Sequence, residues 1–269
     1  MTRPSQSVEL DVLRHSDGEK FTRPDHVARE EPLEIRVEGN PVAVAMRTPG
    51  HDTELAAGFL LTEGVIQDAS DIFELNQCPT QAGNAETPGA VDVLLKNSEK
   101  LDLARLTRHV FTSSSCGLCG KTTIDSVFQS FPPVPSTPTL SPDLILALPE
   151  KLAAAQPTFD KTGGLHACGL FSLQGDLLIS REDVGRHNAL DKLLGHALLK
   201  NWLPLENHLV FLSGRVSFEM MQKTLAARVP AVAAISAPTS LAVDFACRSK
   251  QFLAAFIRGN SYNTYSHGR

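Results

Sequence analysis

The stretch Leu209-Val210-Phe211-Leu212-Ser213-Gly214-Arg215-Val216-Ser217 begins with four apolar residues and ends in a small, polar turn. Four apolar residues in a row are typical of a short strand that is buried on both faces. A helix is predicted from Ser217 to Arg228, followed by a second buried strand from Val232 to Ile235. Strand, helix and strand in this order favour an α/β layered fold. The turn Ser213-Gly214-Arg215 is either a simple tight turn or, as in open α/β sheets, part of a ligand site.

The rest of the C-terminal half continues this alternation. A hairpin is predicted from residues 165–173 and 177–180, and Asp183 is expected to cap a helix from Val184 to Lys200. Pro238 begins another helix, and Phe252 to Ile257 is expected to form the last strand. This regular alternation strengthens the prediction of a layered sandwich.

The N-terminal half is richer in strand signals. Residues 33–37 and 42–46 flank a Gly39-Asn40 turn, which predicts a hairpin. A helix capped by Asp52 or Thr53 is expected through residue 62, and a strand over residues 91–95. Residues 76–90 look like a loop. The predicted organisation is a polar arm (loose, or an edge strand) at 1–30, an N-terminal subdomain at 31–131, a proline-rich linker at 132–142 and a C-terminal cofactor-binding domain at 143–269.

Composition narrows the class of protein. The formal net charge is −5, so broad affinity for nucleic acid is not expected. No apolar signal segment or membrane-spanning run is found, so we expect a cytoplasmic protein that contacts no membrane. Its five cysteines are then reduced, and a closely spaced pair indicates metal binding or catalysis rather than a structural disulfide. Cys168 and Cys247 are expected to be buried as small apolar side chains.

Cys116 and Cys119 form such a pair in Ser113-Ser114-Ser115-Cys116-Gly117-Leu118-Cys119-Gly120-Lys121. The positive charge of Lys121 and the start of a predicted helix from Thr123 to Phe131 favour a thiolate. The glycines allow the backbone to approach a large ligand or sulfur donor. A mobile loop of small residues suits a persulfide that must meet both a donor and an acceptor. The alternative is that these are two ordinary cysteines in a loop, with no chemical function.

Three other functions are alternatives for this cysteine pair. A structural zinc ion usually needs a second pair of ligands, and a zinc deaminase needs a His-x-Glu motif that the chain lacks. A thioredoxin-like motif normally lies near the start of a small domain. A phosphate-binding loop fits residues 115–122 only without its first glycine, and no later strand ends in the acidic residue that would hold magnesium. We expect no structural metal.

Two further segments carry candidate functional residues. The stretch Ser180-Arg181-Glu182-Asp183-Val184-Gly185-Arg186-His187-Asn188 places Arg186 and His187 at a helix start, where the backbone also attracts anions. A solvated cap with local ion pairs is the alternative. The segment Gly163-Gly164-Leu165-His166-Ala167-Cys168-Gly169 is rich in glycine, and His166 by itself is more often a structural histidine than a ligand.

Five motifs in order resemble the FdhD/NarQ family, the formate dehydrogenase accessory sulfurtransferases. They lie at residues 111–121, 163–169, 181–192, 213–220 and 236–242, and the resemblance runs from about Leu33 to Tyr265. It implies a cytidine deaminase-like three-layer α/β sandwich with a smaller β-rich N-terminal subdomain. It also implies a homodimer.

The resemblance further implies a sulfurtransferase that takes sulfur from an IscS-like cysteine desulfurase and passes it to the molybdenum cofactor, bis-molybdopterin guanine dinucleotide, of formate dehydrogenase. GDP is the expected mimic of this bound substrate. Cys116 is the implied persulfide carrier and Cys119 its partner. The implied cofactor-binding residues are Phe256, Ile257, Arg258, Gly259, Asn260 and Ser261, joined by Arg186, His187, Ser213, Gly214 and Arg215 as candidate phosphate or base contacts. A cofactor-sheltering chaperone without catalysis and a zinc-dependent deaminase-like enzyme are the alternatives.

Overall fold

The computed structural model describes residues 5–78, 89–97, 127–128 and 130–266. The N-terminal part contains β1 (Ser7–Ser16), β2 (Glu19–Ala28), β3 (Glu31–Val37), β4 (Asn40–Arg47), α1 (Asp52–Thr62), the short helix η1 (Ala69–Asp71), β5 (Ile72–Cys78) and β6 (Gly89–Leu95). The C-terminal part contains α4 (Pro142–Ala153), α5 (Pro157–Thr162), β7 (His166–Ser172), β8 (Leu177–Asp183), α6 (Arg186–Leu199), β9 (His208–Leu212), α7 (Phe218–Ala226), β10 (Ala231–Ala234), α8 (Ser240–Ser249), β11 (Phe252–Arg258) and β12 (Ser261–Thr264).

The C-terminal part is built on a six-stranded sheet in the order β12-β11-β10-β9-β7-β8. Strands β9, β10 and β11 are parallel and are joined through α7 and α8. Strands β7, β8 and β12 pair antiparallel with their neighbours. The predicted α/β class is therefore confirmed, and the buried strand at 209–212 lies inside the sheet, as its sequence indicates.

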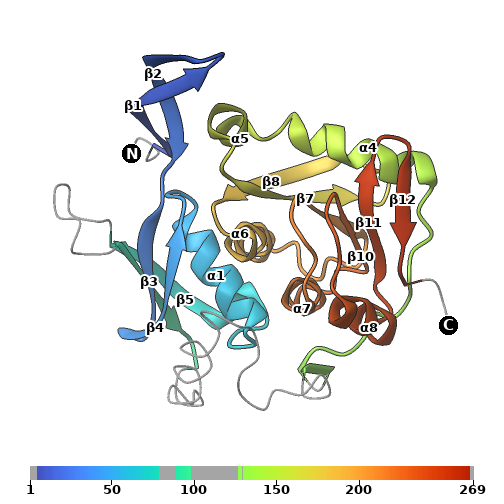
Figure 1. Cartoon of the computed structure of the whole chain (residues 1–269). Coiled ribbons are helices and arrows are strands. Elements are labelled where there is room, and N and C mark those ends of the chain that lie inside the picture. Colours follow the sequence, from blue (N-terminus) through green and yellow to red (C-terminus); the bar gives the residue numbers. More distant parts are fainter. Residues whose placement is uncertain (1–4, 79–88, 98–126, 129, 267–269) are drawn as a thin grey trace.

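Helices cover both faces of this sheet (Figure 1). Consecutive residues of β7 show the division, because side chains alternate between the faces of a strand. Phe171 packs in the apolar cluster that includes Ile145 and Leu148 of α4. Leu170 packs in the larger cluster on the opposite side, together with residues of α6, α7 and α8. The result is a helix–sheet–helix sandwich.

The N-terminal subdomain adds a second sheet behind this sandwich. Its strand order is β4-β3-β6-β5, and helix α1 lies between it and α6 (Figure 1). The two helices approach closely, because a Cβ atom on Gly58 would lie 1.9 Å from the carbonyl oxygen of Asp191. One buried apolar cluster runs from Ile35 of β3 through Leu60 of α1 to Leu193 of α6. The two subdomains thus share a core.

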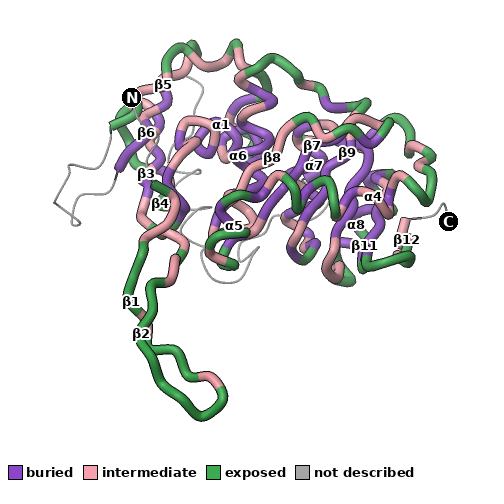
Figure 2. The backbone as a smooth tube through the Cα atoms, turned by 90° about the horizontal axis from the view of Figure 1, so that it is seen from above, coloured by how far each residue is buried: buried purple, intermediate pink, exposed green. Residues whose placement is uncertain are grey.

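Residues 7–28 form a two-stranded ribbon, which is more order than the predicted loose arm or edge strand. Strands β1 and β2 pair antiparallel from Ser7 opposite Ala28 to Ser16 opposite Glu19. None of their residues is fully buried, and the ribbon projects from the body of the molecule (Figure 2). The strands satisfy each other's backbone groups, so they form without the apolar burial that makes a strand visible in a sequence.

Other predicted elements agree with the structure except at specific ends. The hairpin of β3 and β4, helices α1, α6, α7 and α8, and strands β6, β9, β10 and β11 are confirmed. The predicted loop at 76–90 is wrong at both ends, since β5 continues to Cys78 and β6 begins at Gly89. The predicted helix at 123–131 lies mostly outside the described residues, but Val127, Phe128 and Ser130 are helical.

Two predicted helix caps are instead acids of buried ion pairs. Helix α1 has its N-cap at His51, and Asp52 is paired with Arg47 through two contacts of 2.9 Å. Helix α6 has its N-cap at Gly185, and Asp183 pairs with Lys192 at 2.6 Å. Each carboxylate is drawn inward by a cation that local sequence patterns do not reveal.

The proline-rich segment lies against the C-terminal end of α8 rather than apart from the folded protein. The backbone N–H of Val134 donates to the carbonyl of Ser249, and the Thr137 hydroxyl donates to the carbonyl of Lys250. Val134 is buried. The domain boundaries themselves stay a prediction. Among the described residues, no helix has the length and apolar character needed to cross a membrane.

Candidate anion-binding site

One edge of the six-stranded sheet collects most of the predicted site segments. Parallel strands β9 and β10 end there at Leu212 and Ala234. Strand β7 runs the other way and places His166 at the same edge, because Cys168 pairs with Leu212. Strand β8 ends there too, since Asp183 pairs with His166. Ligands of open α/β sheets bind outside the carboxyl ends of the parallel strands, so this edge is the candidate site.

The structure brings four of the predicted residues together around His166. A Cβ atom on Gly214 would lie 3.1 Å from His166 Nδ1 and 3.6 Å from Arg186 Cβ. Burial lowers the pKa of His166, and the positive charges of Arg186, His187 and Arg215 lower it further. A neutral imidazole therefore sits among cationic groups. His166 belongs to the candidate site, which sequence reasoning missed because one histidine in a glycine-rich segment carries no specific signal.

Three buried polar atoms at this edge have no hydrogen-bond partner among the described residues. They are Arg186 Nε, His187 Nε2 and Ser217 Oγ. His187 Nε2 lies 2.8 Å from Glu219 Oε2 as an ion pair, without the geometry of a hydrogen bond. Pairing with His187 lowers the pKa of Glu219, against the effect of burial. Buried donors without acceptors are costly and rare, so these atoms are suited to a bound acceptor such as a phosphate oxygen.

Two helices also begin at this edge without a side-chain cap. The N-cap of α6 is Gly185, which has no side chain, and the N-cap of α7 is Ser217, whose hydroxyl accepts no hydrogen bond from the first turn. Helix α8 differs, because the Thr239 side chain accepts a hydrogen bond from the N–H of Ala242. Uncapped helix starts present backbone N–H groups and the positive end of the helix dipole. Together with the cationic side chains they form a site for a phosphate or pyrophosphate group.

The remaining predicted contact residues have separate positions. The Ser213 hydroxyl accepts a hydrogen bond from the Ala167 N–H at 2.9 Å and thereby ties β9 to β7. Residues 256–261 lie where β11 turns into β12, beyond β10 in the sheet. Ile257 is 1% exposed and packs in the cluster on the α4 side, so only its backbone is available to a ligand. Phe256, Arg258, Gly259, Asn260 and Ser261 are exposed.

Cys116 and Cys119 lie outside the described residues, but the chain that follows them returns next to this site. Phe128 stacks on Phe245 with 5.0 Å between the ring centroids. Phe245 in turn meets Phe218 edge to face at 5.1 Å. Phe218 is the first residue of α7 and directly follows Ser217. Phe128, which follows the cysteine pair in the sequence, therefore packs beside the candidate anion site.

The other cysteines differ from each other. Cys168 is buried, as expected, and burial raises the pKa of its thiol well above the ordinary value. Cys247 is exposed, so the expectation that it is buried was wrong. It lies on α8 at a position that faces solvent, although its neighbour Ala246 is in the core. Cys78 is also exposed.

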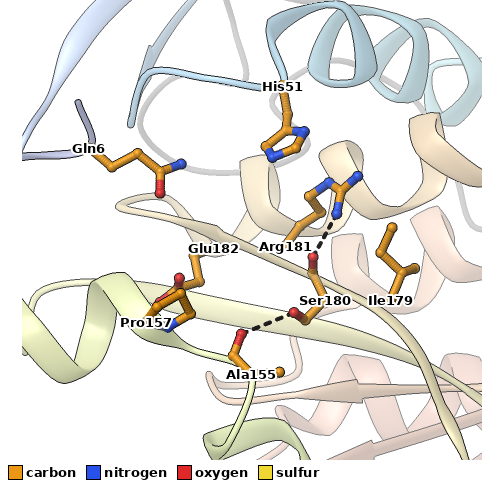
Figure 3. A pocket seen from close by; sticks show the side chains of 8 residues that line it. All are labelled: Gln6, His51, Ala155, Pro157, Ile179, Ser180, Arg181 and Glu182. Carbon is orange, nitrogen blue, oxygen red and sulfur yellow. Dashed lines mark hydrogen bonds between the residues drawn. The ribbon is translucent and has the colours of Figure 1, made fainter. Parts of the chain in front are cut away.

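A cavity of about 370 Å³ lies away from this edge, between β8, the start of β1 and the segments that precede α1 and α5 (Figure 3). Its polar side chains already bond to the protein. Arg181 donates to both carboxylate oxygens of Glu54 at 2.6 and 2.8 Å, and the Ser180 hydroxyl donates to Ala155. Glu182 accepts from the backbone N–H groups of Thr158 and Phe159. This cavity thus offers a ligand fewer unpaired groups than the carboxyl edge does.

Glu54 is the centre of the polar contacts beside this cavity. Burial by itself would raise the pKa of Glu54, but hydrogen bonds from Arg181, His51 and His196 outweigh it and hold the pKa well below its ordinary value. Within the described ranges, no three His, Cys, Asp or Glu side chains gather as a metal site would require.

Comparisons with known proteins agree on one family. Residues 28–269 match the FdhD/NarQ family. A sulfur carrier protein FdhD of Streptomyces avermitilis is 48% identical over 95% of this chain and 92% of its own length. A sulfur carrier protein FdhD of Corynebacterium efficiens is also 48% identical, over 99% of both chains.

A solved structure shares the fold. The crystal structure from Desulfotalea psychrophila, described as that of a formate dehydrogenase accessory protein, superposes with a TM-score of 0.77. It is 26% identical in sequence, and the match covers 98% of both chains. The family match over nearly the whole chain and these relatives show that the protein belongs to the FdhD/NarQ family.

Proposed function

We propose that the protein is a sulfur carrier that acts in the maturation of formate dehydrogenase. Its relatives carry the name sulfur carrier protein, and its cysteine pair has the composition of a sulfur-accepting loop. The observation that carries the proposal is the pair of buried polar atoms without a hydrogen-bond partner, Arg186 Nε and Ser217 Oγ, beside His187. They lie at the sheet edge beside which Phe128, a residue that follows the cysteine pair in the sequence, packs on Phe245.

The sulfur is first taken over as a persulfide. The Cys116 thiolate attacks the terminal sulfur of a persulfide on an IscS-like cysteine desulfurase, and the desulfurase cysteine leaves as a thiolate. Cys116 then carries the extra sulfur. Attack of the Cys119 thiolate on the sulfur of Cys116 forms a disulfide and releases hydrosulfide to the acceptor. A cellular dithiol must afterwards reduce this disulfide.

The acceptor is the molybdenum cofactor in its bis-molybdopterin guanine dinucleotide form, bound as a substrate. Its pyrophosphate groups dock at the uncapped starts of α6 and α7, and Arg186 and Arg215 supply positive charge. The exposed residues Arg258 and Asn260 contact a guanine end. GDP is the corresponding small mimic. We include in this proposal a cytidine deaminase-like fold of the larger sheet and its helices, a homodimer and a cytoplasmic location.

The test of the proposal follows one sulfur atom. The protein is incubated with a cysteine desulfurase and cysteine, and its peptides are weighed by mass spectrometry. The Cys116 peptide should gain one sulfur atom, and Cys116→Ala should abolish both this gain and formate dehydrogenase activation. Cys78→Ala is the matched control, because Cys78 is an exposed free cysteine elsewhere on the protein. Sulfur transfer that survives in Cys116→Ala contradicts the mechanism.

The alternatives give different results in the same preparation. A chaperone that only shelters the cofactor binds GDP and supports formate dehydrogenase without either thiol. A zinc-dependent deaminase-like enzyme contains one zinc ion per chain, which metal analysis detects.

A further inference from the structure

We infer that Thr48, together with the buried pair Asp183 and Lys192, positions the turn that presents Arg186 and His187 to the anion. The inference rests on the proposed function, since it concerns the same site. Thr48 belongs to the loop after β4 in the N-terminal subdomain, and the turn lies between β8 and α6 in the C-terminal sheet. The N-terminal subdomain therefore sets the geometry of a binding site to which Thr48 itself does not belong.

Asp183 is the acceptor at the centre of this arrangement. Its Oδ1 accepts hydrogen bonds from the Gly185 N–H at 2.9 Å and from Asn188 Nδ2 at 3.0 Å. Its Oδ2 accepts from the Thr48 N–H at 3.1 Å and pairs with Lys192 Nζ at 2.6 Å. The Asp183 carboxylate thus holds both sides of the turn, with Gly185 directly before Arg186.

Thr48 completes the arrangement from the other subdomain. Its hydroxyl accepts the Val184 N–H at 3.2 Å, and its carbonyl accepts from Lys192 Nζ at 2.8 Å. Asn188 Nδ2 also reaches back to the carbonyl of Met46 at 2.7 Å. Both backbone groups and the side chain of Thr48 are therefore bonded to the turn or to the pair that holds it.

These contacts are buried, so their geometry is costly to change. Thr48, Asp183 and Lys192 are all 0% exposed. The free energy needed to remove a lysine and an aspartate from water offsets most of the free energy gained from their attraction. Such a pair therefore adds little net stability. Its partners must nevertheless keep their geometry, because an unpaired buried charge is far more costly. The turn also packs closely on the Asn188 side chain, since a Cβ atom on Gly185 would lie 2.9 Å from Asn188 Nδ2.

The molecule contains a matched control for this unit. Thr62 of α1 is also 0% exposed, and its hydroxyl accepts from Lys223 Nζ at 2.8 Å and lies 3.0 Å from Asp191 Oδ1. Lys223 and Asp191 form a second buried pair, at 2.9 Å. This unit also joins the two subdomains, but its contacts are with the bodies of α6 and α7 rather than with the turn.

The experiment compares Thr48→Val with Thr62→Val, since each removes one buried hydroxyl and keeps the shape of the side chain. GDP affinity is measured by calorimetry, and thermal unfolding is measured in parallel. Thr48→Val should weaken GDP binding by about fivefold or more, the equivalent of one lost positioning hydrogen bond. Both variants should lower the melting temperature by similar amounts, because each loses one buried hydrogen bond. Thr62→Val should leave the GDP affinity within about twofold of wild type. Thr48→Ser retains the hydroxyl and should restore affinity.

The outcomes separate this inference from the proposed function. Wild-type protein that binds GDP, with Thr48→Val equal to wild type or Thr62→Val equally impaired, overturns the positioning role alone. Absence of GDP binding to the wild type contradicts the proposed docking site. In that case the backbone amide NMR shifts of Arg186 and His187 still test the geometry. Both chemical shifts should change in Thr48→Val and remain unchanged in Thr62→Val. Unchanged shifts in Thr48→Val overturn the inference.

Discussion

Gly195 of α6 packs so closely against α1 that a Cβ atom in its place would lie 1.8 Å from the carbonyl oxygen of Glu54. No side-chain adjustment relieves a contact with backbone, so the helices must separate if this position carries a methyl group. Gly195→Ala should therefore destabilise the protein by about 3 kcal/mol or more. Urea unfolding measures this loss.

Gly164→Ala is the control for Gly195→Ala. Its added Cβ atom would lie 3.4 Å from the Cβ of Ala28, which is an ordinary contact. The free energy of unfolding should change by less than about 0.5 kcal/mol. Equal losses in the two variants would show that the approach of α1 and α6 is not the cause.

Glu54→Gln should make the free energy of unfolding less dependent on pH in the acidic range. The native pKa of Glu54 is depressed, so its ion pairs stabilise the folded state above the unfolded pKa of about 4.3 and lose this effect as the pH falls through the native value. The variant should be less stable than wild type at pH 7 and should lose less further stability down to pH 3. Urea unfolding at several pH values measures this. Glu150→Gln, at an exposed site on α4, should follow the wild-type profile.

Ser217→Ala should weaken GDP binding with little effect on the free energy of unfolding. The Ser217 hydroxyl has no partner among the described residues, so its loss should cost less than about 0.5 kcal/mol. Thr239→Ala removes a true helix cap and should cost about 1 kcal/mol. GDP affinity should fall in Ser217→Ala only. A stability loss in Ser217→Ala as large as in Thr239→Ala would show that Ser217 already has a partner in the folded protein.

Cys168 should resist alkylation in the native protein. Burial raises the pKa of its thiol and blocks access to reagents, whereas Cys78 and Cys247 are exposed. Brief treatment with iodoacetamide, followed by peptide mass spectrometry, should find Cys78 and Cys247 modified and Cys168 unmodified. Urea should make Cys168 reactive. Labelling of native Cys168 at the rate of Cys247 would contradict its burial.

The sequence predicts the C-terminal sheet well because burial leaves a direct pattern there. Residues 209–212 are apolar without interruption, and the strand lies between two neighbours with helices on both faces. The glycine-containing turn after it predicts a ligand edge by the general rule for open sheets. The clustering of Arg186, His187, Gly214 and Arg215 follows from that topology.

The errors occur where long-range contacts decide the structure. Asp183 has the local pattern of a helix cap, but its partner Thr48 is 135 positions earlier in the chain. The β1–β2 ribbon contains no buried residue, so its alternating charges resemble a solvated arm. The unpaired state of Ser217 Oγ depends on how α7 meets its neighbours, and no spacing in the sequence encodes this.

The apolar cluster that runs from β3 through α1 and α6 into the larger sheet also determines how the protein loses its structure. Neither subdomain can open without exposing side chains that the other one covers. Proteolysis or hydrogen exchange should therefore find one cooperative unit across both sheets, with the β1–β2 ribbon as the separate, early-opening part. The C-terminal half produced without the N-terminal subdomain would therefore expose the apolar face that α1 covers. It would be an incompletely folded protein and not a smaller working carrier.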